Sequence, residues 1–308
     1  MTDTQTFENK LSTFTYGIVG LGIMGGSIAK AIRNSVGQSN FFSGRILGLD
    51  KNTQSLEAAK KEQIIDEGFL PYQNKIMLSQ CDFVFICLYP HAILDFLQEN
   101  KNSFKDNAII TDISGVKNLL ETHYDQICPP NADFIMGHPM AGGEKEGFES
   151  SKCEFFINHN YILIDKPNNI ASKIHRQNIE IFKTLIHKMG FSKITITDSN
   201  THDNKIGFTS QLCHVVASAM VESAEDEQIT SFGGGSFEDL TRIAMINAPL
   251  WTELFLSNKE KLVSHIESFK KQLTLMEDYI QNENKEELCA LLTKVRHKRI
   301  KMQQNNNK

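Results

Sequence analysis

Short apolar runs alternate with helical patterns over the first two thirds of the chain. The runs have the length and the near-continuous apolar character of strands buried on both faces of a sheet. They lie at residues 16–20, 45–50, 82–88, 108–113, 133–136, 161–164 and 193–196. The patterns between them predict helices at residues 24–33, 56–60, 92–97, 117–127 and 171–189. Strands separated by helices favour right-handed crossovers, so the pattern predicts an α/β fold with a doubly wound parallel sheet.

The pattern changes after Asp198, because long amphipathic helical stretches then replace the strands. We therefore expect an α/β domain at residues 1–199, followed by an all-helical C-terminal domain at residues 200–308. The helical stretches carry more apolar positions than one short bundle needs. This excess predicts that the helical domain also forms a homodimer.

Composition narrows the class of protein and its partners. The 308 residues are 40% hydrophobic and carry a net charge of −5, which favours a globular chain and argues against nucleic acid or an anionic membrane as a partner. No apolar run approaches the roughly 20 residues of a membrane helix, and the polar N-terminus does not read as a signal peptide. The six cysteines are scattered and lack metal-ligand spacing, which predicts reduced thiols in a cytoplasmic protein and no metal site.

A glycine-rich turn stands between the first expected strand and the first expected helix. Gly20, Gly22 and Gly25 form the G-x-G-x-x-G pattern. Its glycines allow a tight turn, close approach of a pyrophosphate, and close packing of helix on strand. The start of the helix offers unpaired N–H groups to the phosphates. We therefore expect a Rossmann-type dinucleotide site, whose cofactor contacts are Gly20, Gly22, Ile23, Met24 and Gly25.

Asp50 ends the second expected strand and indicates which dinucleotide binds. A carboxylate there accepts hydrogen bonds from the adenosine ribose and repels a 2′-phosphate, so the sequence favours NAD over NADP. Asp50 lies further along the chain than the usual spacing of about 20 residues, and a long loop at residues 34–44 accounts for the difference. Lys51 leaves the strictness of this preference open. The alternative interpretation is that Asp50 starts a turn or caps the next helix.

Four further segments carry more specific patterns. They are residues 111–117 (TDISGVK), 137–147 (GHPMAGGEKEG), 202–214 (HDNKIGFTSQLCH) and 233–244 (GGGSFEDLTRIA). Together with the glycine turn, they resemble prephenate dehydrogenases over most of the chain. The resemblance implies an NAD-dependent oxidoreductase that decarboxylates prephenate to 4-hydroxyphenylpyruvate in tyrosine biosynthesis. Its amino analogue arogenate is the nearest alternative substrate, and the sequence does not decide between the two.

His138 follows an expected strand, at the edge where open α/β sheets place their ligands. An ordinary imidazole is largely neutral at pH 7 and can accept a proton. The resemblance assigns to His138 the proton of the substrate's ring hydroxyl, which it takes as the ring carbon gives up hydride. The alternative is a structural histidine held by hydrogen bonds.

A polar stripe on the first helix after residue 200 supports a second histidine. Asp203, Ser210 and His214 are separated by seven and four residues and fall on one face of a helix. Such a stripe on an otherwise apolar helix indicates a cleft, although a solvated face is nearly as good an explanation for Asp203. By resemblance, His214 and Ser210 contact the substrate or order its site.

Prephenate is a dianion, so the resemblance also requires a fixed positive charge. Arg242 lies in the matching segment, and a guanidinium binds a carboxylate through two hydrogen bonds. The alternative is a surface ion pair with Glu238 or Asp239. The sequence does not decide which substrate carboxylate Arg242 binds. Gly235, in the glycine run before it, is expected to let the chain approach the substrate closely, whereas Trp251 is expected to pack in the core.

One position departs from the family pattern. Relatives usually carry a serine directly before the Val-Lys pair, where it orients the histidine and the nicotinamide. This chain has Gly115 there and Ser114 one residue earlier. We take Ser114 as the candidate that replaces the usual serine.

Two other readings of the sequence remain. A β-hydroxyacid dehydrogenase also joins a glycine-turn domain to a helical one, but it carries a K-x-x-N pattern that fails here, because Phe208 follows Lys205 by three residues. A dinucleotide-binding sensor without chemistry is the other alternative. Such a protein is expected to have lost a proton acceptor or an anion clamp, whereas this chain has His138, His214 and Arg242 together.

Overall fold

The computed structural model describes residues 3–37, 42–143, 145–164 and 173–306 of the chain. The chain divides into two compact units, Met1–Asn258 and Lys259–Lys308, and each is described by itself. This is a different division from the expected domain boundary at residue 199, which stays a prediction. Part of the expected long loop, residues 38–41, and the start of the helix expected from residue 171 lie outside the described residues.

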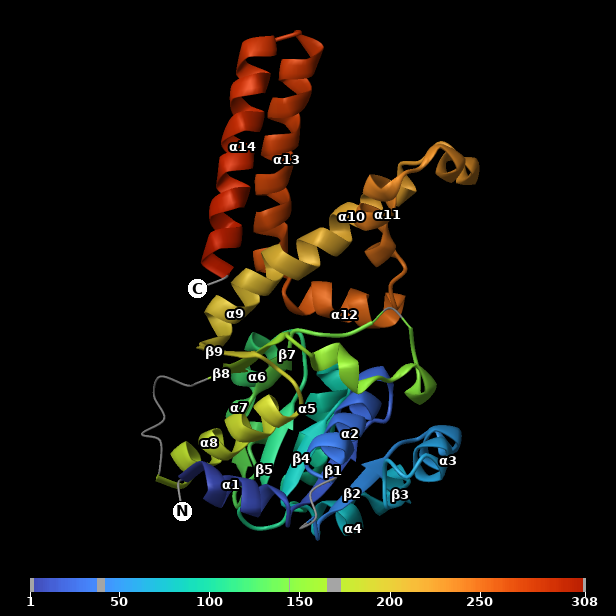
Figure 1. The fold of residues 1–308 in the computed structure, drawn as a ribbon, viewed down its shortest axis with the longest axis vertical. Coiled ribbons are helices and arrows are strands. Elements are labelled where there is room, and N and C mark those ends of the chain that lie inside the picture. Colours follow the sequence, from blue (N-terminus) through green and yellow to red (C-terminus); the bar gives the residue numbers. More distant parts are fainter. Residues whose placement is uncertain (1–2, 38–41, 144, 165–172, 307–308) are drawn as a thin grey trace. The chain divides into compact units, whose positions relative to one another are not determined.

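A six-stranded parallel sheet forms the centre of the first unit (Figure 1). Its strands are β1 (Thr15–Val19), β2 (Arg45–Leu49), β3 (Glu67–Phe69), β4 (Phe83–Ile86), β5 (Ile109–Asp112) and β6 (Asp133–Phe134). Their order is β3-β2-β1-β4-β5-β6. The chain therefore reverses its direction of winding between β1 and β4, the point at which open α/β sheets bind ligands. The sequence pattern predicts every strand of this sheet except the three-residue β3.

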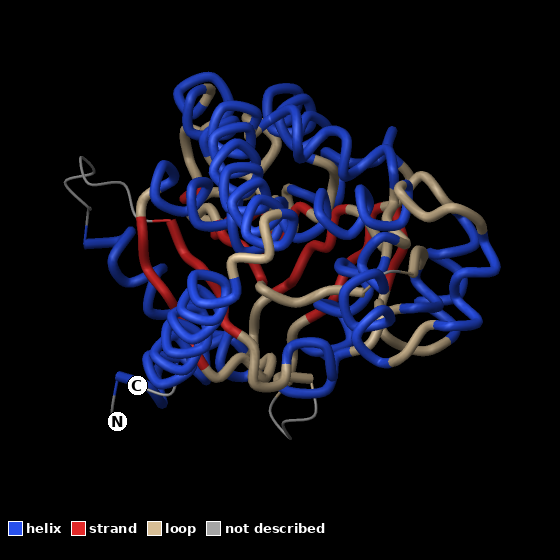
Figure 2. Tube along the Cα trace, turned by 90° about the horizontal axis from the view of Figure 1, so that it is seen from above, coloured by secondary structure: helices blue, strands red, loops and turns tan. Residues whose placement is uncertain are grey.

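Helices cover both faces of this sheet (Figure 2). Successive residues of β1 show the two sides, because Ile18 packs in one hydrophobic cluster and Val19 in the other. The helices that contribute to the Ile18 side are α1 (Asp3–Leu11), α2 (Ile23–Ser35), α3 (Thr53–Lys61) and α8 (Lys173–Lys188). Those on the Val19 side are α4 (Asn74–Leu78), α5 (Pro90–Asn100), α6 (Asn118–Thr122) and α7 (Tyr124–Ile127). The predicted doubly wound fold is confirmed.

The last three strands form a second sheet instead of extending the first. It comprises β7 (Gly137–Pro139), β8 (Asn160–Ile164) and β9 (Lys193–Thr197), with β7 and β8 antiparallel. The expectation that all strands share one parallel sheet is therefore wrong for β8 and β9, and β7 is a strand that the pattern did not predict. The strand expected at 133–136 stops after two residues, and the chain then turns into β7, which brings His138 to the sheet edge.

Helices follow β9 through the rest of the first unit, and the described residues beyond Thr197 contain no strand. Their order is α9 (Ser199–Ile206), the π-helix η4 (Gly207–Gln211), α10 (Leu212–Glu222), α11 (Gly235–Thr241) and α12 (Ala248–Ser257). Short 3-10 turns lie between them and in the α/β part: η1 (Pro71–Gln73), η2 (Phe148–Ser150), η3 (Cys153–Phe156), η5 (Glu227–Phe232) and η6 (Arg242–Ala244). The predicted change from α/β to helical structure after Asp198 is confirmed.

The second unit is a pair of helices, α13 (Lys259–Gln281) and α14 (Lys285–Asn306), joined by a short turn (Figure 1). Glu283 in this turn has a positive φ of 52°. Among the described residues, no helix combines the length and apolar composition needed to cross a membrane.

Candidate active site

A cavity of about 650 Å³ lies over the point where the sheet reverses its winding. Its walls include residues that follow β1, β4 and β5, the edge strand β7, and parts of η4, α10 and α12. Ile23, Met24, Ser114, His138, Ser210 and His214 line it, as do Gly22 and Gly25. The cavity thus joins the glycine turn, the candidate base and the helical stripe, which lie far apart in the sequence.

The glycine turn meets the demands of a dinucleotide site. Gly20 has a φ of 88°, and a Cβ there would lie 2.5 Å from the Cys87 carbonyl oxygen. A Cβ on Gly25 would overlap the Gly20 carbonyl oxygen, so these two glycines serve the packing of the turn itself. At Gly22, which caps α2, a Cβ would meet no protein atom within 4 Å. The protein's own packing does not require a glycine at this position, which fits the close approach of a pyrophosphate.

Asp50 lies at the end of β2 and fixes the glycine turn from the side. Its Oδ2 accepts a hydrogen bond from the Leu21 N–H at 2.6 Å, and its Oδ1 accepts one from the Asn52 N–H at 2.7 Å. The cap of α3 is Asn52, whose side chain accepts from Gln54 and Ser55. Asp50 is therefore not the cap of the next helix. Each of its oxygens keeps a lone pair for a ribose hydroxyl.

His138 lies on β7 and borders the cavity. Its Nδ1 is 2.9 Å from Nε2 of His202, and Nδ1 of His202 is 2.7 Å from Oδ1 of Asp203. Burial lowers the pKa of His138 well below the usual 6.5, and the neighbouring His202 and Lys117 lower the pKa further. A histidine that stays neutral is ready to accept a proton at neutral pH.

A buried ion pair fixes the loop beside His138. Lys117 Nζ lies 2.5 Å from Oδ2 of Asp112, and both side chains are fully buried. The same Nζ donates to the carbonyl of Gly137, the residue before His138. Burial lowers the pKa of Lys117, while the adjacent Asp112 carboxylate raises it in opposition. The pair therefore fastens the end of β5 to the start of β7, directly behind the candidate base.

Ser114 is buried and lines the cavity. Its side chain bonds within its own loop and not to His138. Its Oγ accepts from the Val116 N–H at 3.2 Å, which closes the loop after β5. A Cβ on Gly115 would instead lie 3.8 Å from Nε2 of His138. The place of the usual family serine therefore faces the base directly, and here it holds only a glycine.

The helical stripe does not stay on one face, because a π-helix interrupts it. The wider turn at Gly207–Gln211 changes the register, and π-turns of this kind are frequent at functional sites. Ser210 and His214 line the cavity, whereas Asp203 is fully buried against the backbone N–H groups of Lys117 and Asn118. Both expectations for Asp203 are therefore wrong, because its side chain faces neither the solvent nor the cavity.

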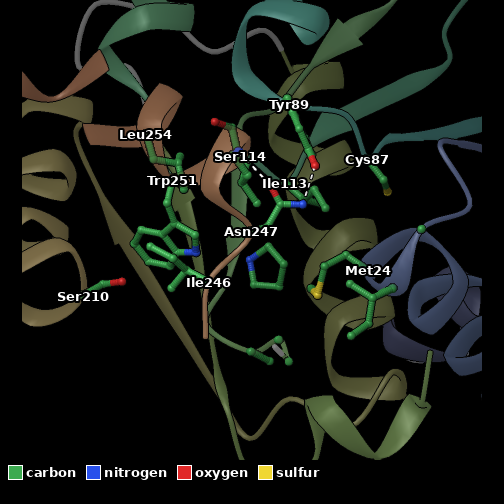
Figure 3. Close-up of a pocket in the computed structure, with 18 of the residues that line it drawn as sticks. Met24, Cys87, Tyr89, Ile113, Ser114, Ser210, Ile246, Asn247, Trp251 and Leu254 are labelled. Atoms are coloured by element: carbon green, nitrogen blue, oxygen red, sulfur yellow. Dashed lines mark hydrogen bonds between the residues drawn. The ribbon is translucent and has the colours of Figure 1, made fainter. Parts of the chain in front are cut away.

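His214 is held by two contacts. Its Nδ1 lies 3.0 Å from the Ser210 carbonyl oxygen, and its ring stacks on Trp251 with 3.5 Å between ring centroids. Burial lowers its pKa, against the Ser210 contact, which raises it. Trp251 lines the cavity together with Leu254 and Ile246, opposite Met24 (Figure 3). The expectation that Trp251 packs in the core is therefore wrong.

Arg242 and Gly235 do not line this cavity, although their neighbours Ile243 and Met245 do. Both residues are exposed, in a segment that also exposes the ring of Phe232 to 93%. The structure therefore brings eight of the candidates to the cavity walls, whereas these two lie outside. Their predicted contact with substrate stays a prediction.

One edge of the cavity is bridged by a residue that the sequence reading missed. The Asn247 amide donates to Tyr89 Oη at 2.8 Å (Figure 3). It also donates to Glu146 Oε1 at 2.6 Å. Its Oδ1 also caps α12 by accepting from the Leu250 N–H. The bridge ties the start of α12 to the loops after β4 and β7.

His202 is the other functional residue that the sequence reading missed. His202 and Asp203 are adjacent on a helix, so their polar side chains point in different directions and the sequence does not indicate that either is buried. The structure shows that both are. His202 stands four residues before Ile206, but only the structure shows that Ile206 lines the cavity, so this spacing gave no signal in the sequence. No group of three or more His, Cys, Asp or Glu residues within the described ranges could hold a metal ion.

Two family models match the chain in succession. The model of the prephenate dehydrogenase nucleotide-binding domain matches residues 28–196. The model of the prephenate dehydrogenase dimerization domain matches residues 198–294.

Relatives and solved structures agree with these models. The prephenate dehydrogenase of Lactococcus lactis is 30% identical over 267 residues, which cover 83% of this chain and 68% of the relative. That of Bacillus subtilis is 28% identical over 277 residues, which cover 88% and 71%. The crystal structure of prephenate dehydrogenase from A. aeolicus in complex with hydroxyphenyl propionate and NAD+ has a TM-score of 0.81 and 30% identity, and the match covers 94% of this chain and 98% of that one.

Proposed function

The chain belongs to the prephenate dehydrogenase family, and from this premise we propose that it is an NAD-dependent prephenate dehydrogenase. The observation that carries the proposal is the single cavity that contains both the glycine turn and His138. A hydride acceptor bound at the turn and a base at His138 are the two parts that the reaction needs in one place. The solved relative holds NAD+ and a hydroxyphenyl compound together.

The residues at the turn fit NAD. Gly22 leaves room for the pyrophosphate, the start of α2 supplies N–H groups, and Asp50 keeps lone pairs for the adenosine ribose. Ile23 and Met24 continue the contact surface along the cavity wall. When bound, NAD supplies the electrophilic nicotinamide that takes up the hydride.

His138 takes the proton of the substrate's ring hydroxyl through Nε2. The C–H bond at the same ring carbon breaks toward the nicotinamide, and the hydroxyl oxygen becomes a carbonyl. The ring carboxylate then leaves as CO2, and its bonding electrons complete the aromatic ring. The former carbonyl oxygen takes the proton back from His138, which gives the phenol of 4-hydroxyphenylpyruvate. The lowered pKa of His138 keeps the imidazole neutral and ready for this step.

The remaining candidates bind or order the substrate. Ser210 and His214 face the cavity from the helical side, where His214 stacks on Trp251. Ser114 shapes the loop beside the base. Arg242 supplies the positive charge for a carboxylate, and Gly235 allows the chain to approach the ligand.

We assign the protein to the cytoplasm and to a homodimer. None of the six cysteines forms a disulfide in the described residues, as is usual in a reducing compartment. Apolar side chains are exposed on the segment matched by the dimerization model, among them Phe232, Leu240 and Met245. Sedimentation that gives only a monomer at micromolar concentration would contradict the dimer.

An assay of NADH formation tests the function. The wild type is expected to form NADH with prephenate, and the same assay with arogenate decides between the two substrates. His138→Asn is expected to lower kcat by about 10²- to 10⁴-fold, the usual contribution of a general base. His187→Asn, at the end of α8, serves as the matched control and is expected to retain full activity. If the wild type binds NAD but oxidises neither substrate, the proposal fails.

A further inference from the structure

We propose that His202 and Asp203 form a positioning relay for His138, which keeps Nε2 of His138 free of a proton and shares the charge that this base acquires. The role of His138 as base rests on the proposed function. The relay itself is a statement about three side chains and can be measured without substrate.

The three side chains form one unbroken chain of short contacts. Nδ1 of His138 is 2.9 Å from Nε2 of His202, and Nδ1 of His202 is 2.7 Å from Oδ1 of Asp203. His202 is 1% exposed and Asp203 is 0% exposed, so water does not compete for these contacts. The two imidazole rings meet edge to face, at 5.1 Å between centroids.

The direction of each hydrogen bond follows from the partners of Asp203. Its two oxygens accept from the backbone N–H groups of Lys117 and Asn118, both at 2.8 Å. These partners can only donate, so both oxygens of Asp203 serve as acceptors, and His202 presents Nδ1–H to Oδ1. A neutral imidazole has one N–H, and Nε2 of His202 is therefore an acceptor. Nδ1 of His138 then carries the proton, and Nε2 of His138 holds a lone pair.

This tautomer is the one that catalysis needs. Nε2 of His138 lies next to Gly115 at the cavity wall, and a Cβ added to Gly115 would be 3.8 Å from it. An imidazole without an acceptor at Nδ1 can carry its proton on Nε2 and then cannot take a second one there. Gly115 has no hydroxyl that could orient the imidazole ring of His138. The hydrogen bond to His202 therefore orients this ring.

The relay also stabilises the charge formed in the reaction. When the substrate's hydroxyl proton moves to Nε2, His138 becomes an imidazolium whose Nδ1–H points at His202. His202 in turn donates to the Asp203 carboxylate, so the positive charge faces a buried negative one through a neutral ring. The other charged groups beside the relay are Lys117 and Asp112, which neutralise each other at 2.5 Å.

The relay joins two parts of the first unit. His138 belongs to β7, whereas His202 and Asp203 belong to α9. Asn258 also donates to the Asp203 carbonyl oxygen and to Gln211, both at 2.8 Å, which holds α9 against the end of α12. The orientation of the base is therefore set by the placement of α9.

Kinetics of two matched variants test the relay. His202→Gln removes the link to Asp203 and is expected to lower kcat roughly 100-fold, with little change in KM for either ligand. His175→Gln breaks a similar pair, because Nδ1 of His175 lies 2.7 Å from Asp133 on β6, away from the cavity. This control is expected to keep wild-type kcat. A His202→Gln variant with wild-type kcat, or equal losses in both variants, would overturn the relay.

Nitrogen-15 NMR of histidine-labelled wild-type protein tests the tautomers directly. Both His138 and His202 are expected to carry their proton on Nδ1, with resonances assigned from His138→Asn and His202→Gln. Protonated Nε2 on neutral His138 would overturn the proposal even if His202→Gln failed to fold. If the tautomers are as expected but neither substrate is oxidised, the proposed function fails and the relay remains.

Discussion

The wall of the cavity that holds His138 and the segment that carries Arg242 are built in opposite ways. Around His138, the polar groups are buried and bonded to one another, as in the Lys117–Asp112 pair and the contact from His202 to Asp203. The segment with Gly235 and Arg242 is exposed and lies outside the cavity walls. The groups that handle the proton are thus buried at the cavity wall, whereas the candidate anion clamp is exposed and lies outside it.

This difference has an energetic reason. A buried charge or polar group without a partner is costly. The groups near His138 therefore stay in the arrangement that pairs them, because any other arrangement would leave one of them unpaired. The contacts of an exposed arginine contribute little to stability, because water competes for the charge and the long side chain must be ordered. We therefore expect substitutions on the two sides to damage different properties: stability and kcat on the first, KM on the second.

The largest effect on stability is expected from breaking the buried ion pair beside His138. Lys117→Met leaves the Asp112 carboxylate buried without its ion pair and is expected to lower the free energy of unfolding by about 3–5 kcal/mol. Lys105→Met removes a more exposed pair with Asp82, for which about 0–1 kcal/mol is expected. Urea titration of both variants measures the difference. Equal losses would mean that burial does not distinguish the two pairs.

On the exposed side, Arg242→Gln is expected to raise KM for the substrate while kcat falls less. Charged hydrogen bonds contribute about 1.5–3 kcal/mol, which corresponds to a rise of about 10- to 150-fold. Arg176→Gln, an exposed arginine on α8, is the control and is expected to leave KM unchanged. Unchanged KM in Arg242→Gln would remove it from the substrate site.

The bridge by Asn247 is expected to matter least. Asn247→Ser keeps a cap for α12 but loses the amide donor to Tyr89 and Glu146. A neutral hydrogen bond contributes about 1 kcal/mol, so KM is expected to rise at most roughly fivefold, with kcat unchanged. A loss of kcat as large as that of His202→Gln would show that Asn247 acts, like the buried groups around His138, in positioning the base.

The pH dependence of the wild type sharpens the same contrast without any substitution. His138 works in its neutral form, and its pKa in the folded protein is lowered by burial. The neutral form therefore persists below the ordinary pKa of 6.5, and kcat/KM is expected to stay level through neutral pH and to fall only at lower pH. A fall that begins above pH 6.5 would show that His138 is more solvated than its surroundings indicate.

Local patterns predicted much of the fold, since strand and helix periodicity and glycine spacing depend on near neighbours. The same periodicity did not predict that β7, β8 and β9 leave the main sheet, because pairing partners are a long-range property. The helix expected at residues 117–127 is two short helices with a break at His123. The seven-and-four spacing of Asp203, Ser210 and His214 assumed a regular helix, and the π-turn between them changed which residues face the cavity.

The sequence by itself determined the types of residue available for the chemistry: the glycine turn, Asp50, His138, and the motifs shared with prephenate dehydrogenases. Only the tertiary structure decided how they are used. It joined His138 to His202 across 64 positions of the chain, buried Asp203 behind them, and left Arg242 outside the cavity. The reason is physical: a hydrogen bond between distant residues depends on where whole elements pack, and the partners that this packing supplies then determine which nitrogen carries the proton.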